Sequence, residues 1–306
     1  MTTRNVQIVE VGPRDGFQPI EQAIPTERKI DLVARLHAAG IRRMEATAFV
    51  SPRAVPQMAD AAEVLDAAHR LEGLDTQVLV PTRRYAEQAI GQGARHLAFV
   101  LSASAAHNRN NVRRSPEESA DEFVELAGAL PAGVRIRLNL ATAFDCPFEG
   151  RIEPAQVIEL IDRLQHGLPG VELCLCDTTG RTTPDAVSGL FDAIGPHLPD
   201  GCTVAFHGHD TYGLGVANAL AAYHAGVDVF DASFGGLGGC PFAPGATGNV
   251  ATEDLVWTFE RMGIPTGIDL DALIDAATDA ATIPGACPGG RVRTALAAAR
   301  GRESSL

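Results

Sequence analysis

Residues 171–233 contain three apolar runs of strand length, VELCLCD (171–177), CTVAFHGH (202–209) and VDVFDAS (227–233). A segment with helical periodicity follows each run, near Pro184, Gly213 and Ala251. Strands that alternate with helices in this way are typical of a parallel sheet covered by helices.

The same alternation extends toward the N-terminus. Five further runs precede helix-period segments: NVQIVEV (5–11), RRMEATAF (42–49), DTQVLV (75–80), HLAFVLS (96–102) and VRIRLNLA (134–141). Eight strand–helix units within about 250 residues predict an α/β fold, the (β/α)8 TIM barrel. The alternative is a doubly wound open sheet, but that fold usually has fewer strands, and no GxGxxG follows the first run. No nucleotide redox cofactor is therefore expected.

The domain organisation follows from this count. We expect one catalytic domain over residues 1–306, with the barrel at about 5–265 and a helical C-terminal extension at about 266–306. One or two helices of the extension are expected to cap the barrel or to reach a second subunit, so a homodimer is predicted.

Composition excludes several classes of partner. The net charge of −13 argues against a nucleic acid or an anionic membrane surface. The apolar runs are too short to span a membrane, and strand-like sequence begins by Val6, which leaves no room for a targeting peptide. Six cysteines without a secretory signal indicate free thiols and a cytoplasmic location. Cys174 and Cys176 are expected to fill the core.

The only lysine is Lys29, and every other basic residue is arginine. Lys29 lies in an amphipathic helix rather than at a strand end. A Schiff-base mechanism needs a desolvated lysine inside the active site, so the sequence predicts that no Schiff base is used.

Polar residues gather where the predicted strands end, which is the face on which barrel enzymes place their active sites. They are Arg14 and Asp15 after the first strand, Glu45 and Thr47 on the second, Asp177 on the sixth, His207 and His209 on the seventh, and Cys240 and Asn249 after the eighth. Alternation along VAFHGH gives His207 and His209 the parity of Ala205, so both imidazoles should face the barrel interior. The same argument places Asp177 inside with Leu173 and Leu175.

Two histidines at i and i+2 on a strand can chelate one divalent ion. A core histidine beside one bonded to a loop is the alternative. Asp15 and Asn249 at neighbouring strand ends favour a metal, and two nitrogen and two oxygen ligands suit Mg²⁺ or Mn²⁺ better than Zn²⁺. Asn249 could instead cap the helix that begins near Ala251.

The stretch SFGGLGGCPFAPGATGN (233–249) carries Cys240 among six glycines. Such a loop can open and close and bring a thiol to a reacting carbon. Phosphate binding by its backbone amides is the alternative, although the loop contains no basic residue. Next to a metal ligand, Arg14 is suited to neutralise a carboxylate or enolate oxygen.

Four motifs together resemble the 3-hydroxy-3-methylglutaryl-CoA lyase family: VEVGPRDGFQ (9–18), EATAFVSPRAVPQMAD (45–60), HGHDTYGLGVAN (207–218) and SFGGLGGCPFAPGATGNVATEDL (233–255). The resemblance implies that Asp15, His207, His209 and Asn249 bind the ion. It also implies that Arg14 and Gln18 contact the substrate, that Cys240 is the catalytic acid, and that Glu45 and Asp177 are acidic site residues.

The implied reaction is metal-dependent cleavage of a 3-hydroxyacyl-CoA into acetyl-CoA and a keto acid, acetoacetate for the family's usual substrate. Either His207 or Asp177 would be the base. Leu214, Gly215 and Phe242 stand where the family usually has Gln, Ala and Tyr, so a related acyl group stays open. An acetyl-CoA-dependent synthase, a 2-oxo-acid aldolase and a non-catalytic metal-binding scaffold are the further alternatives.

Overall fold

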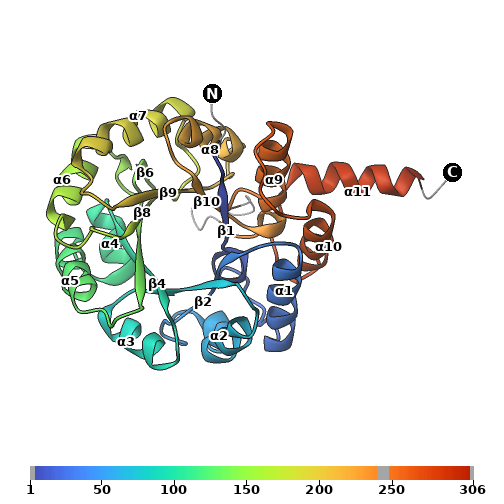
Figure 1. The fold of residues 1–306 in the computed structure, drawn as a ribbon, viewed down its shortest axis with the longest axis horizontal. Helices are drawn as coiled ribbons and strands as arrows, with labels where there is room; N and C mark the ends of the chain where they lie inside the picture. The colour runs from blue at the N-terminus through green and yellow to red at the C-terminus, as the bar shows by residue number, and fades with distance from the viewer. Residues whose placement is uncertain (1–3, 240–247, 304–306) are drawn as a thin grey trace.

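Eight parallel strands close into a barrel in the order β1-β10-β9-β8-β5-β4-β3-β2 in the computed structural model, which describes residues 4–239 and 248–303. Helices surround the strands in a ring (Figure 1). Closure is complete because β1 pairs with both β2 and β10. The predicted (β/α)8 barrel is confirmed, and the open-sheet alternative is excluded.

Each barrel strand lies within one of the eight predicted apolar runs. The strands are β1 (Gln7–Glu10), β2 (Arg43–Ala48), β3 (Asp75–Val80), β4 (His96–Ser102), β5 (Arg135–Ala141), β8 (Glu172–Asp177), β9 (Thr203–Gly208) and β10 (Val229–Ala232).

The outer helices begin and end at ordinary helix signals. They are α1 (Thr26–Ala38), α2 (Ala61–His69), α3 (Arg83–Gly91), α5 (Pro116–Gly128), α6 (Pro154–Leu164), α7 (Pro184–Ile194), α8 (Gly215–His224) and α9 (Thr252–Arg261). Proline opens α5, α6 and α7, where its missing N–H is not needed. Ser115 and Glu118 form a capping box on α5.

The C-terminal extension forms two helices, α10 (Leu270–Ala280) and α11 (Arg291–Glu303). Helix α10 packs against α1 and α9, whereas α11 contacts α9 and α10 and then runs outward from the barrel (Figure 1). No helix within residues 4–239 and 248–303 is long and apolar enough to cross a membrane.

Several short elements in the loops were not predicted. They are the helix α4 (Ala105–Val112), the hairpin strands β6 (Asp145–Cys146) and β7 (Gly150–Arg151), and the single turns η1 (Gly12–Gly16), η2 (Pro56–Met58), η3 (Gly195–His197) and η4 (Phe234–Gly236). Helix α4 lacks an apolar stripe. Its conformation depends on Asn108, whose buried amide donates to the backbone of Arg114 and Ser115 and to Ser119 Oγ.

The predicted orientation of strand β9 is confirmed. Phe206 points outward, where its ring lies 6.1 Å from that of Phe144 and 6.3 Å from that of Phe191 on α7. His207 points inward and contacts Asp231 on the neighbouring strand. Both faces of the strand are buried, so bulky residues occupy the side that faces the helices.

The predicted orientation of strand β8 was wrong. Leu173 and Leu175 pair in register with Val204 and Phe206 and therefore face the helices. Cys174 and Cys176 face the interior, where they form a small buried cluster with Ala205. The error arose because leucine and cysteine are equally suited to either face of a strand that is buried on both sides.

A bulge in strand β2 corrects the expectation for Thr47. The register shifts between Glu45 and Thr47, so Thr47 pairs with Val78 and its hydroxyl meets Met58 Sδ at 3.7 Å. Thr47 consequently leaves the interior face, while Glu45 remains on it.

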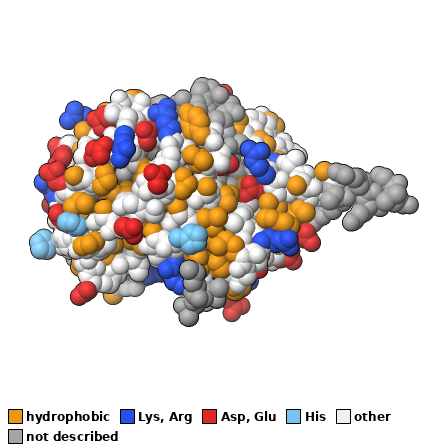
Figure 2. Space-filling view, turned by 90° about the horizontal axis from the view of Figure 1, so that it is seen from above, with side chains coloured by type: hydrophobic (Ala, Val, Ile, Leu, Met, Phe, Trp, Pro, Cys, Tyr) orange, Lys and Arg blue, Asp and Glu red, His pale blue; other side chains and the backbone are white. Residues whose placement is uncertain are grey.

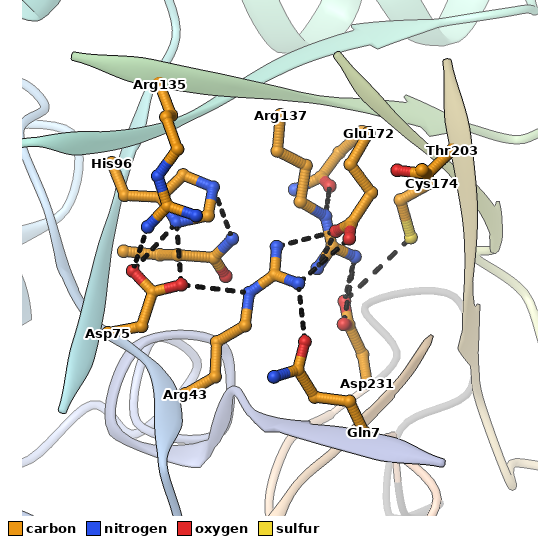
Figure 3. A network of polar contacts seen from close by, with 12 residues as sticks. Gln7, Arg43, Asp75, His96, Arg135, Arg137, Glu172, Cys174, Thr203 and Asp231 are labelled. Atoms are coloured by element: carbon orange, nitrogen blue, oxygen red, sulfur yellow. Dashed lines mark hydrogen bonds and ion pairs between the residues drawn. The ribbon is translucent and has the colours of Figure 1, made fainter. Parts of the chain in front are cut away.

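The barrel interior is polar (Figure 3). Arg43 donates to both carboxylate oxygens of Glu172, at 2.8 and 2.6 Å, and His96 bonds to Asp75 at 3.0 Å. These pairs lie toward the amino ends of the strands, away from the predicted site. In this layer of the interior, buried side chains of opposite charge are paired with one another.

The outer surface carries charges of both signs. Acidic and basic side chains are interspersed over the face drawn in Figure 2. Lys29 is not among the exposed charges: it is buried in α1, where its Nζ lies 2.9 Å from Asp60 and also donates to the backbone of Gln57.

Candidate metal centre and active site

The turn η1 presents two of the predicted site residues, Arg14 and Asp15, directly after strand β1. The turn packs closely against η4, since a Cβ added to Gly12 would lie 2.4 Å from the Phe234 ring and 2.8 Å from Glu10 Oε1. Only glycine fits at this position. The first strand end is thereby held against the turn that begins the glycine-rich loop.

Asp15, His207 and His209 come together at the carboxyl ends of the strands. One potential ligand atom from each lies within 4.8 Å of the other two. The two imidazoles are 5.1 Å apart between ring centroids and both are buried. This arrangement corresponds to the cluster expected from the HxH motif.

Asn249 joins the cluster from the residues that follow the loop. Its Nδ2 donates to Asp15 Oδ2 at 2.7 Å and to the Leu237 carbonyl at 3.0 Å. It pairs with His209 across an isolated bridge. The alternative role as a helix cap is wrong, because Ala251 occupies the N-cap of α9.

Two unpartnered polar atoms indicate that the cluster suits a cation. His209 Nδ1 and Asn249 Oδ1 are buried and have no hydrogen-bond partner among the described residues. Both atoms can donate a lone pair, and a buried polar atom without a partner is costly. An imidazole, a carboxylate and a carboxamide oxygen are a donor set suited to a divalent ion.

The charges at the cluster favour an anionic Asp15. Burial alone would raise its pKa, but Arg14 and the two imidazoles hold that pKa well below its usual range. Burial opposes a charge on His207, yet the hydrogen bond that it donates to Asp231 and nearby negative groups raise its pKa to about 9. Burial and the adjacent His207 lower the pKa of His209 to about 4.

Arg14 connects the cluster to Glu45. Its Nε donates to Glu45 Oε1 and its Nη1 donates to Asp15 Oδ1. Arg14 is 8% exposed and Glu45 2%, so the guanidinium is held at the edge of the site by two carboxylates. Burial raises the pKa of Glu45, an effect that Arg14 opposes.

Asp177 ends strand β8 and pairs in register with Gly208, which lies between the two histidines of the HxH motif. Its Oδ1 accepts from Gly180 N at 3.0 Å, whereas its buried Oδ2 has no partner among the described residues. Burial raises the pKa of Asp177 to about 7, and His207 is close enough to oppose this rise. A carboxyl group in this state can exchange a proton near neutral pH.

The structure describes the predicted substrate contact Gln18 but not the predicted acid Cys240. Gln18 is exposed and lies on a groove formed with Pro56 and Gln57, outside the buried cluster. Cys240 lies outside the described residues. The residue before it, Gly239, contacts Gly248, because a Cβ at Gly248 would lie 2.7 Å from Gly239 N.

Glu10, which the sequence analysis overlooked, links the segments around the site. Its Oε1 accepts from Gly12 N at 2.8 Å and Phe234 N at 3.0 Å, and its Oε2 accepts from the Thr252 hydroxyl at 2.7 Å. A single carboxyl group therefore joins η1, η4 and the start of α9. Its place at the end of an apolar strand was the available signal.

Replacing Glu10 by Gln should flatten the pH dependence of stability. Burial raises the pKa of Glu10 from 4.5 to about 8. Between these values the unfolded chain loses the proton and the folded chain keeps it, so the free energy of unfolding falls by up to about 1.4 kcal/mol per pH unit. Glu10→Gln keeps an acceptor for both amides and has no proton to lose. Urea unfolding at pH 5, 6.5 and 8 measures the difference.

Glu63→Gln on the exposed face of α2 is the matched control, which should retain the wild-type pH dependence. If Glu10→Gln and the wild type lost stability equally between pH 5 and pH 8, Glu10 would not be the group responsible.

The fold and the site define a class: a (β/α)8 barrel with a candidate divalent-metal site at the carboxyl ends of its strands. Within that class the identification is more specific. The chain belongs to the HMGL-like family, whose model matches residues 5–279. The resemblance drawn from the four motifs is confirmed.

Three comparisons illustrate the relationship. The chain is 43% identical over 272 residues to the mitochondrial hydroxymethylglutaryl-CoA lyase of Bos taurus, covering 89% of this chain and 83% of the relative. The crystal structure of the Bacillus subtilis HMG-CoA lyase superposes with a TM-score of 0.91 at 37% identity, covering 97% of this chain and 99% of the other. An HMG-CoA lyase from Acinetobacter baumannii, solved with coenzyme A and 3-methylmalate, gives a TM-score of 0.87 at 39% identity, with 95% of each chain covered.

Proposed function

We propose that this protein is a divalent-metal-dependent carbon–carbon lyase that cleaves 3-hydroxy-3-methylglutaryl-CoA into acetyl-CoA and acetoacetate. The observation that carries the proposal is the buried cluster of Asp15, His207 and His209, with Arg14 bonded to it. The chain belongs to the HMGL-like family, and the relatives compared above are named hydroxymethylglutaryl-CoA lyases.

Asp15, His207, His209 and Asn249 would hold the ion, which we propose to be Mg²⁺ or Mn²⁺ because oxygen ligands contribute half of the set. A divalent ion bound there would act as a Lewis acid that lowers the pKa of the substrate's 3-hydroxyl. The unpartnered His209 Nδ1 and Asn249 Oδ1 support this set.

We propose Asp177 as the base. His207 Nδ1 is bonded to Asp231 and its other nitrogen is needed as a ligand, so His207 keeps no lone pair for a proton. Asp177 has an unpartnered buried oxygen and a pKa raised by burial to about 7. When it takes the proton from the 3-hydroxyl, the electron pair left on that oxygen forms the C3 carbonyl as the C2–C3 bond breaks. The electron pair of the broken bond moves to the thioester as an enolate.

Arg14 would stabilise the enolate oxygen, since its guanidinium is held at the site by Glu45 and Asp15. Cys240 would protonate the enolate carbon to give acetyl-CoA. The assignment of Cys240 rests on the likeness of its loop to the family's motif, and the chain belongs to that family. Gln18, at the outer groove, would contact a more distant part of the acyl-CoA.

The test compares substrate classes with the Mg²⁺-loaded protein. The panel contains the methylglutaryl-CoA ester, the corresponding free acid, an aldol adduct of a 2-oxo acid, and acetyl-CoA supplied with a 2-oxo acid. Turnover of the ester alone supports the lyase. Turnover of the aldol adduct would support an aldolase, net condensation would support a synthase, and metal binding without any turnover would leave a metal-binding scaffold.

The family departures at Leu214, Gly215 and Phe242 lead to a prediction about the acyl group. Leu214 lacks the amide of the usual glutamine and Phe242 lacks the hydroxyl of the usual tyrosine, so an ester with a longer alkyl group at C3 should be cleaved with equal or higher kcat/KM. The difference should be modest, because one methylene in an apolar pocket changes binding by about 1–3 kcal/mol. Much slower cleavage of the longer ester would leave the methyl ester as the preferred substrate.

The homodimer, the cytoplasmic location and the single-domain boundaries stay predictions. Sedimentation of the purified chain would test the first of them directly.

A further inference from the structure

We infer that Asp231, held in place by Arg137, is a positioning residue that sets which ring nitrogen of His207 faces the metal site. The inference rests on the metal centre of the proposed function and adds to it two residues that lie deeper in the barrel. Both are buried: Arg137 is 1% exposed and Asp231 4%.

The geometry joins three strands in one line. Arg137 on β5 donates from Nη2 to Asp231 Oδ1 at 2.9 Å and to Oδ2 at 2.8 Å. Asp231 on β10 then meets His207 Nδ1 on β9 at 3.1 Å. Figure 3 shows the Arg137–Asp231 pair inside the barrel.

The donors and acceptors fix the direction of the last bond. Asp231 is paired with a guanidinium, which cannot be deprotonated in a protein, so the carboxylate is an acceptor. His207 Nδ1 must therefore carry the hydrogen. The other nitrogen, Nε2, is left as the only one whose lone pair can face Asp15 and His209. A carboxylate that orients a ligating imidazole in this way raises its basicity as a ligand.

Arg137 also pairs with a second carboxylate, that of Glu172, and this residue supplies a matched control. Its Nη1 lies 3.3 Å from Glu172. Glu172 is bonded to Arg43 as well, but no contact joins it to His207 among the described residues. A variant at Glu172 disturbs the same guanidinium and leaves the imidazole bond intact.

Asp231→Asn tests the inference because an amide has one acceptor. Arg137 retains the amide oxygen, so the NH₂ group turns to His207 and forces the hydrogen onto Nε2. Titration calorimetry with Mn²⁺ alone, without substrate, should show affinity reduced by about 10–100-fold. Glu172→Gln should bind Mn²⁺ within about twofold of the wild type.

A second readout reports the tautomer itself. In the metal-free wild type at pH 10, where His207 is neutral, ¹⁵N-histidine NMR should show the His207 hydrogen on Nδ1, with the signal assigned by its loss in His207→Gln. In Asp231→Asn it should appear on Nε2. A merely structural role of Asp231 would change neither the tautomer nor the Mn²⁺ affinity of a folded variant.

If Asp231→Asn does not fold, the pair R137M/D231N removes both charges together and is measured in the same way. The inference would be overturned if a folded Asp231 variant bound Mn²⁺ as tightly as the wild type and still carried the His207 hydrogen on Nδ1. Cleavage of the ester by the wild type is measured separately. A wild type that binds Mn²⁺ but does not cleave the ester would refute the proposed function and leave this positioning role standing.

Discussion

Removal of the divalent ion by a chelator is expected to abolish ester cleavage, and Mg²⁺ or Mn²⁺ should restore it. The reason is the donor set: Asp15, His207, His209 and Asn249 converge at one point, and two of their buried polar atoms have no other partner. His209→Ala removes one ligand and should weaken Mn²⁺ binding by at least about tenfold, with a matching loss of turnover at low metal concentration.

His96→Gln is the matched control for this variant. His96 is also a buried barrel histidine, but it bonds to Asp75 near the amino ends of the strands. The His96→Gln variant should have a lower melting temperature than the wild type and the same affinity for Mn²⁺. Full turnover by metal-stripped protein would contradict the assignment of the site.

Cys240→Ser should lower kcat by at least about a hundredfold and leave Mn²⁺ affinity unchanged. A general acid contributes about 10²–10⁴ in rate, and a hydroxyl is a far weaker acid than a thiol. Cys240 should also react with an alkylating reagent in the free protein and be shielded when substrate is bound. Single-turnover kinetics with the ester measures the first effect, and mass spectrometry of the alkylated protein measures the second.

Cys287→Ser is the control for the thiol. Cys287 is a half-buried free cysteine in the segment between α10 and α11, and its loss should leave kcat within about twofold of the wild type. Near-wild-type turnover of Cys240→Ser would place the acid on another residue.

The strands could be predicted from the sequence because each is a short apolar run followed by a helical segment. Which face of a strand lines the barrel was harder. In β9 the large Phe206 alternates with small or polar residues, so the orientation was correct. In β8 the two polar residues, Glu172 and Asp177, stand at opposite parities, so they do not indicate which of the leucine and cysteine faces lines the barrel. Apolar character alone does not separate two buried faces.

The cluster itself was predictable in part, since its members follow strand ends that a parallel barrel brings to one rim. The residues that support the cluster were missed. Glu10 and Asp231 act through hydrogen bonds to segments more than twenty residues away, and those partners follow only from the register of neighbouring strands. Alternation along VFDAS (229–233) puts Asp231 on the other face of its strand from Phe230. This was the one sequence signal that Asp231 points into the barrel.

The most direct test of the account is the cleavage of 3-hydroxy-3-methylglutaryl-CoA by the Mg²⁺-loaded protein in D₂O, with the products identified by mass spectrometry. Carbon–carbon cleavage through an enolate predicts equal amounts of acetoacetate and acetyl-CoA. The methyl group of acetyl-CoA should carry one deuterium, which the enolate carbon takes from the exchanged acid. Recovery of the intact ester, or of free coenzyme A with 3-hydroxy-3-methylglutarate, would contradict it.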